Sequence, residues 1–129
     1  MNRTIGNIRV YATPEALAIA AAEEFFMRAF QARTNGQIFS CALSGGSTPA
    51  RMLTRMSDFE TLARLPAGFW NYVHFFWGDE RDVPLDHPDS NFRLAREALF
   101  DKIDIPEENL HPIQAGFNST QATAISYEN

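Results

Sequence analysis

Short apolar runs alternate along this chain with segments that begin like helices, and this order constrains the fold more than any other feature. Apolar strands that alternate with helices are typical of a parallel sheet covered by helices on both faces. The sequence therefore predicts an α/β fold. We expect strands at residues 8–12, 38–43, 73–77 and 110–113.

The expected helices begin at capping residues. The first begins at Thr13-Pro14 and ends by Asn35-Gly36, with an apolar face that consists of Leu17, Ala20, Ala21, Phe25 and Ala29. We expect four further helices: one that is entered through Pro49 and runs through Arg55, a short one within 58–70, one from Asp89 or Ser90 to Pro106, and one from Asn118 or Ser119 to Tyr127. The third of these four presents Phe92, Ala95, Leu99 and Ile103 at helical spacing.

Composition narrows the class of protein. The chain has 129 residues, which suits one domain, and a net charge of −5, which disfavours nucleic acid and anionic membranes as partners. No apolar run is long enough to span a membrane, and none follows the first residues as in a signal peptide. The single cysteine, Cys41, lies in an apolar run, so we interpret it as a core residue in a reducing compartment, the cytoplasm.

The segment from Ser44 to Pro49 lies between a predicted buried strand and a predicted helix. Helix N-termini carry unpaired N–H groups and a partial positive charge. Glycines at 45 and 46 allow a close anion approach, and the hydroxyls of Ser44, Ser47 and Thr48 add donors. Arg51 and Arg55 lie one turn apart and could add charge. We interpret the segment as a monophosphate site; an ordinary capped turn is the alternative.

The loop from Gly78 to Asp89 is acidic and leaves the third predicted strand at the same edge of the sheet. Three interpretations stay open. Its acids could hold sugar hydroxyls or orient a water molecule while Arg81 binds phosphate. They could simply be solvated and cap the next helix. They could ligate a metal ion, although no known ligand spacing is present; that set would be Asp79, Glu80, Asp82, His87 and Asp89.

Three histidines are candidate acid–base groups. His74 lies within an aromatic strand and His111 beside a strand end, so we expect structural hydrogen bonds for both. His87, in the acidic loop, is the plausible acid or base of the three.

Three segments together resemble the 6-phosphogluconolactonase family. They are Leu43-Ser-Gly-Gly-Ser-Thr-Pro49, Phe76-Trp-Gly-Asp-Glu-Arg81 with Val83-Pro84 and His87-Pro-Asp-Ser-Asn91, and Ile105-Pro-Glu-Glu-Asn109 with His111-Pro-Ile113. The first is shared loosely with glucosamine-6-phosphate deaminases, whereas the second is similar to the lactonases alone. The resemblance covers residues 8–129 and implies that residues 1–129 are the N-terminal portion of a single lactonase-like domain.

The resemblance implies a three-layer α/β/α, Rossmann-like parallel sheet of the deaminase/ribose-phosphate-isomerase type, here truncated. It implies hydrolysis of 6-phospho-D-glucono-1,5-lactone to 6-phosphogluconate, in the oxidative pentose phosphate pathway, without a metal or cofactor. Carried over by position, Gly45, Gly46, Ser47, Thr48 and Arg81 would hold the phosphate. Asp79 and Asn91 would shape the sugar end of the pocket.

The chain departs from the family in one respect. The family's catalytic histidine lies in a later segment of the form Gly-x-Gly-x-Asp-Gly-His, which would fall beyond Asn129, and no histidine here fits that motif. We therefore expect the chain to supply the phosphate-binding half of a lactonase. The alternatives are a non-catalytic sugar-phosphate-binding fragment and a deaminase-like enzyme. Half a parallel sheet also leaves an open edge and a bare face, which predicts self-association or a missing C-terminal half.

Overall fold

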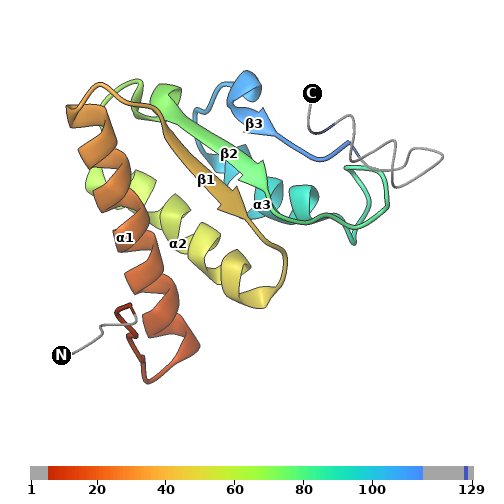
Figure 1. The fold of residues 1–129 in the computed structure, drawn as a ribbon, viewed down its shortest axis with the longest axis horizontal. Coiled ribbons are helices and arrows are strands. Elements are labelled where there is room, and N and C mark those ends of the chain that lie inside the picture. The colour runs from red at the N-terminus through yellow and green to blue at the C-terminus, as the bar shows by residue number, and fades with distance from the viewer. Residues whose placement is uncertain (1–5, 115–126, 128–129) are drawn as a thin grey trace.

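The structure is a computed structural model that describes residues 6–114 and Tyr127, with the backbone alone at 61–63. Helices and strands alternate as predicted (Figure 1). Their order is α1 (Pro14–Thr34), β1 (Phe39–Leu43), α2 (Ser47–Ala63), the 3₁₀ helix η1 (Phe69–Tyr72), β2 (Val73–Trp77), α3 (Asn91–Ala98), the 3₁₀ helices η2 (Phe100–Lys102) and η3 (Glu107–Asn109), and β3 (Leu110–His111).

The three strands form one parallel sheet in the order β1-β2-β3, which confirms the predicted fold class. Leu43 at the end of β1 is in register with Trp77 at the end of β2. Just beyond, the Gly78 N–H donates to the Leu43 carbonyl at 2.9 Å. The loops that follow β1 and β2 therefore leave the sheet side by side, at its carboxyl edge.

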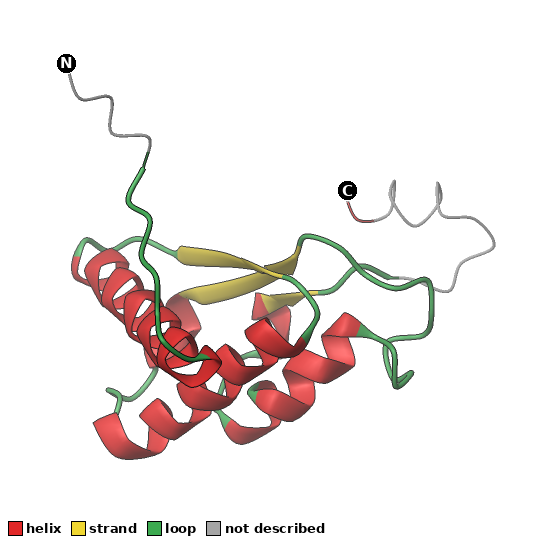
Figure 2. Ribbon diagram, turned by 90° about the horizontal axis from the view of Figure 1, so that it is seen from below, coloured by secondary structure: helices red, strands yellow, loops and turns green. Residues whose placement is uncertain are grey.

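The described α-helices all lie against one face of the sheet (Figure 2). Burial alternates along β2, where Val73, Phe75 and Trp77 are buried and His74 and Phe76 are not. The prediction that residues 38–43 are buried on both faces is wrong for the described chain, because no described helix covers the second face. That face carries Ser40, Ala42, His74, Phe76 and His111.

The predicted strand at residues 8–12 is also wrong. Residues 6–11 have no regular structure, and the side chains of Ile8 and Val10 are 87% and 89% exposed. A strand exists only where its backbone pairs with a neighbour, and no described strand lies beside this segment. Its one ion pair joins Arg9 to Glu24 of α1 at 3.7 Å.

Helix α1 begins and ends where its capping residues predict. Thr13 Oγ1 accepts from the Ala16 N–H at 3.1 Å, and the helix ends before Asn35 and Gly36, whose φ is +67°. Phe25 and Ala29 are buried as predicted, but the rest of the buried face differs from the prediction, because α1 also buries the adjacent ring of Phe26. The buried residues are Ala18, Ala22, Phe25, Phe26 and Ala29, while Leu17 is exposed.

The later helix ends differ from the predictions. Helix α2 continues past Arg55 to Ala63, so the segment 58–70 holds the end of α2 and η1 rather than a separate helix. Ser90 caps α3 as expected, but α3 ends at Ala98 rather than at Pro106 because Leu99 leaves the helical conformation. The predicted helix from Asn118 or Ser119 lies outside the described residues, except for Tyr127.

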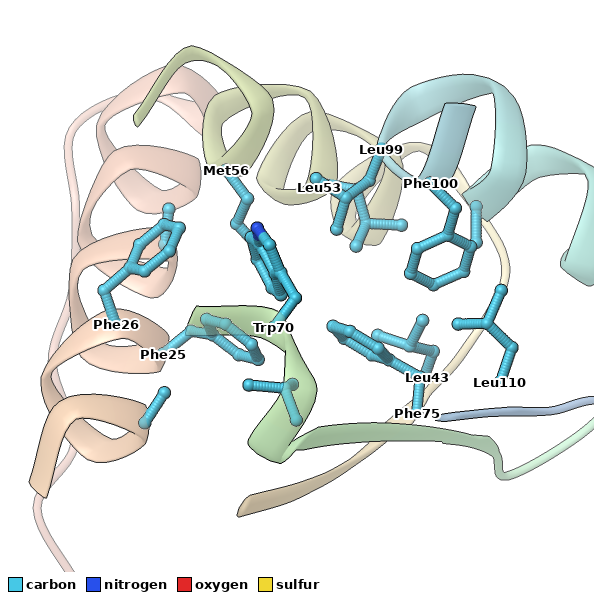
Figure 3. Packing of buried hydrophobic residues seen from close by; sticks show 14 of the residues in the cluster. Phe25, Phe26, Leu43, Leu53, Met56, Trp70, Phe75, Leu99, Phe100 and Leu110 are labelled. Atoms are coloured by element: carbon cyan, nitrogen blue, oxygen red, sulfur yellow. The ribbon is translucent and has the colours of Figure 1, made fainter. Parts of the chain in front are cut away.

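Aromatic rings dominate the core between the helices and the sheet (Figure 3). Phe75 is fully buried, and its ring centroid lies 5.7 Å from that of Phe25 and 5.0 Å from that of Phe100. Trp70 packs beside them and donates its indole N–H to Glu60 at 2.7 Å. This core fixes the position of β2 and of the loop that follows it.

We predict that Phe75→Ala lowers the free energy of unfolding by about 3–5 kcal/mol, since it leaves a cavity in a packed core. Phe76→Ala is the matched control, because the neighbouring ring lies on the bare face and is 37% exposed. Urea unfolding followed by circular dichroism gives both values. Equal losses for the two variants would contradict the one-sided core.

Candidate functional site

The N-terminus of α2 has no side-chain cap. Gly46 precedes it with φ +103°, a conformation that favours glycine, and no side chain bonds the first amides. Ser47, Thr48 and Ser44 are exposed, and Pro49 has no N–H. The first helical bond of this turn runs from the Ala50 N–H to the Gly46 carbonyl at 3.2 Å. The amides of residues 47 and 48 are therefore available to an anion.

Gly45 lies against the amide of Asn91, the first residue of α3. A Cβ at Gly45 would overlap the carboxamide of Asn91, so no larger residue fits without a shift. Asn91 is buried, and its Nδ2 donates to the Asp79 carbonyl at 3.2 Å. Asn91 therefore joins the loop after β1 to the loop after β2, which brings the two predicted site segments together.

Glu80 occupies the N-terminus of α3. Its carboxylate accepts from the backbone N–H groups of Asn91 at 2.7 Å and Phe92 at 3.0 Å, and from the Ser90 hydroxyl at 3.2 Å. It also accepts from the N–H of Arg81 at 2.7 Å. The sequence analysis named Glu80 as one of five candidate metal ligands, but the described residues form no cluster of metal ligands. Of the three interpretations of the acidic loop, the one in which its acids cap the next helix describes Glu80 best. Glu80 lies ten residues before Ser90, the N-cap residue of α3.

Asp79 and Arg81 flank Glu80, and both are exposed. The Arg81 guanidinium makes no ion pair or hydrogen bond with any described residue, so it is available to a ligand. Arg55 is engaged elsewhere: it binds Glu15 of α1 and, at 3.2 Å, Asp58. The sequence predicted that Arg55 could add charge to an anion site, but its guanidinium instead forms ion pairs, one of which joins α1 to α2.

A cavity of about 440 Å³ lies beside the first turns of α2. Ser47 and Arg51 line it on the side of the uncapped N-terminus, and the Arg55 ion pairs close it on the other. Arg51 is exposed and has no ion pair within the described part of the chain. Arg51 and Ser47, the first residue of α2, thus line the same cavity.

The histidines form structural contacts. His74 and His111 lie on neighbouring strands of the bare face, with His74 Nδ1 2.9 Å from His111 Nε2, and His111 stacks on Phe76. Desolvation, followed by the charge of His74, lowers the pKa of His111. His87 Nδ1 accepts the N–H of Asp89 at 3.0 Å, so one of its two nitrogens is engaged in the turn.

Cys41 and the acidic residues show no sign of metal or thiol chemistry in the described chain. Burial raises the pKa of the Cys41 thiol to about 11, so the thiol stays protonated near neutral pH and behaves as a core group.

Within residues 6–114 and Tyr127, no three His, Cys, Asp or Glu side chains gather as metal ligands would. None of the described helices combines the length and apolarity needed to cross a membrane.

Comparison with known proteins assigns the fold and the two loops to a family. The family described as glucosamine-6-phosphate isomerases/6-phosphogluconolactonase matches residues 12–129. The chain belongs to this family. Membership in the glucosamine-6-phosphate isomerase/6-phosphogluconolactonase family confirms the resemblance carried by the three sequence segments.

The relatives similar in sequence are named 6-phosphogluconolactonases. The Synechocystis protein is 49% identical over 90 residues, which is 68% of this chain and 34% of that protein. The Nostoc protein is 46% identical over 92 residues, 70% of this chain and 35% of that protein. The chain thus spans about a third of the length of these family members.

Solved structures of the family share this fold. The 6-phosphogluconolactonase from Trypanosoma brucei superposes with a TM-score of 0.72 at 34% identity, over 94% of this chain and 46% of that one. The enzyme from Thermotoga maritima gives a TM-score of 0.69 at 30% identity, over 87% and 48%. A monomeric glucosamine-6-phosphate deaminase gives 0.73 at 19% identity and shows the fold alone.

We predict that Gly45→Ala lowers the free energy of unfolding by about 1–3 kcal/mol, because the new methyl group overlaps the Asn91 amide. In an Asn91→Ala background the same change should cost clearly less. Urea unfolding of the four proteins forms a double-mutant cycle. An equal cost in both backgrounds would mean that the two residues are not in contact.

We predict that stability falls as the pH is lowered through the ordinary histidine pKa, near 6.5. The lowered pKa of His111 means that the folded state takes up its proton less readily than the unfolded chain, so the contribution is full above that pH and lost below it. Urea midpoints between pH 7.5 and 5.5 measure the fall. His111→Gln should flatten it, and His87→Gln, a histidine outside this face, is the control. If the urea midpoint of His111→Gln falls as steeply with pH as that of the wild type, the assignment to His111 is wrong.

Proposed function

We propose that this chain binds the phosphate of 6-phospho-D-glucono-1,5-lactone, as the phosphate-binding part of a 6-phosphogluconolactonase. The reaction is hydrolysis of the lactone to 6-phosphogluconate, in the oxidative pentose phosphate pathway. Family membership and the names of the relatives support the reaction. The observation that carries the assignment to this chain is the uncapped N-terminus of α2, beside a loop with an available arginine.

The proposed phosphate site combines backbone and side-chain donors. The amides of Ser47 and Thr48 lie at the positive end of a 17-residue helix, and the hydroxyls of residues 44, 47 and 48 are exposed. Gly46 leaves open space where a side chain would begin, whereas the space at Gly45 is filled by the Asn91 amide. Arg81 supplies a charged donor that suits the oxygens of a phosphate monoester.

The sugar end of the ligand would lie toward the loop after β2. Asn91 closes this side of the site through its contacts with Gly45 and the Asp79 carbonyl. The exposed carboxylate of Asp79 can accept hydrogen bonds from sugar hydroxyls. These two residues would orient the sugar ring relative to the phosphate.

No described histidine is proposed as the base that activates water. His74 and His111 bind each other on the bare face, and His87 Nδ1 accepts a backbone N–H. The family resemblance places the base in a Gly-x-Gly-x-Asp-Gly-His segment, which does not occur within residues 1–129. We therefore propose a binding role for this chain's own residues and assign none of them to the proton transfer.

We also propose that the sheet is completed by further chain, either a second copy or the remainder of a lactonase domain. An apolar cavity of about 340 Å³ lies along the unpaired edge of β1, where α1 and α2 meet it, with Leu17, Met52 and Pro49 in its lining. The bare sheet face adds Phe76, which is partly exposed. We propose a cytoplasmic location, which the single cysteine, read as a residue of a reducing compartment, supports.

We predict that Arg81→Ala weakens binding of 6-phosphogluconate at least about tenfold while leaving binding of gluconate nearly unchanged, since the guanidinium would contact only the phosphate. Isothermal titration calorimetry with the two ligands measures both. Arg28→Ala, an exposed arginine of α1 that pairs with Glu24, is the control. An equal loss for both ligands would remove Arg81 from the phosphate site.

A further inference from the structure

We propose that Glu80 is a positioning residue for the phosphate site: its carboxylate fastens the loop after β2 to the start of α3 and so fixes Arg81 and Asn91. This inference rests on the proposed function, because it assigns Glu80 a role in holding the groups that would meet a sugar phosphate. Glu80 itself would not touch the ligand.

The geometry of the carboxylate carries the inference. One oxygen, Oε1, accepts from the backbone N–H groups of Arg81 and Asn91, each at 2.7 Å. The other, Oε2, accepts from the Phe92 N–H at 3.0 Å and the Ser90 hydroxyl at 3.2 Å. One residue from the start of the loop, Arg81, and three from the start of α3, Ser90, Asn91 and Phe92, thus converge on one side chain, which closes the segment 80–92 into a ring.

Both residues that this ring fixes belong to the proposed site. The Glu80 oxygen that binds Arg81 also binds Asn91, so one atom sets the separation between the backbones of the two residues. Asn91 in turn contacts Gly45, directly before the α2 N-terminus. A series of contacts therefore connects Arg81 to Glu80, Glu80 to Asn91, and Asn91 to Gly45.

Glu80 also sets which helix can bind an anion at this edge of the sheet. With Ser90 Oγ accepting from Arg93 at 3.3 Å, each of the first three amides of α3 has an acceptor, and the carboxylate neutralises that helix end. Helix α2 has no such cap. A phosphate group would therefore meet one positive helix end here rather than two.

The contacts require glutamate rather than a similar side chain. Glutamine keeps the length but offers an NH₂ group in place of Oε2, which cannot accept the Phe92 N–H. Aspartate keeps the charge but is one methylene shorter, so it cannot reach the same four donors. The two variants Glu80→Gln and Glu80→Asp thus separate acceptor geometry from charge.

The test is calorimetric binding of 6-phosphogluconate to the whole chain. We expect Glu80→Gln and Glu80→Asp to weaken binding about tenfold, the scale of one lost charge-assisted hydrogen bond. In an Arg81→Ala background we expect Glu80→Gln to weaken it by less than about threefold, because the effect through Arg81 has already been removed. The control is Glu97→Gln, which changes an exposed glutamate of α3. This variant should bind 6-phosphogluconate as the wild type does.

The outcomes separate this inference from the proposed function. If the wild type does not bind 6-phosphogluconate, the proposed function fails and this inference fails with it. If the wild type binds and both Glu80 variants bind equally well, only the positioning role is overturned. A full tenfold loss in the Arg81→Ala background would overturn the positioning of Arg81, since Glu80 would then act independently of that residue. Loss of the folded circular dichroism spectrum in both variants would make Glu80 a residue that the fold requires, and would overturn the positioning role too.

Discussion

Parallel pairing of β1 with β2 is the constraint on which the rest of the structure depends. In register, the two strands end together at Leu43 and Trp77, and the hydrogen bond from Gly78 to Leu43 extends the pairing by one residue. The loops that follow must then start side by side. Every contact of the candidate site, from Gly45 against Asn91 to the ring closed by Glu80, follows from that placement.

The three α-helices within residues 6–114 differ in how their N-termini are capped, and this difference distinguishes the candidate site. Thr13 caps α1, and Ser90 with Glu80 caps α3. Helix α2 follows Gly46 without a side-chain cap. Uncapped amides at an exposed helix end are costly unless water or a ligand accepts their hydrogen bonds. The open N-terminus of α2 can therefore accept a ligand, and the relatives of this chain are named for a phosphorylated substrate.

What the sequence could predict was local. Caps such as Thr13-Pro14 and Ser90 act within one turn, so α1 and α3 begin where expected. The strand at 8–12 depends on a partner strand, and burial of 38–43 on both faces depends on a second helix layer; neither can be inferred from the segment itself. The cap formed by Glu80 spans ten residues of irregular loop, which no periodicity detects. The position of the glycine-rich loop before α2 was predictable because glycines, hydroxyls and a helix start are adjacent in sequence.

The most direct measurement of the central claim is a crystal structure of the chain with 6-phosphogluconate. The account predicts phosphate oxygens about 2.7–3.1 Å from the backbone nitrogens of Ser47 and Thr48, with the Arg81 guanidinium on the same group. A phosphate bound elsewhere, with those two amides facing solvent or another part of the protein, would contradict it.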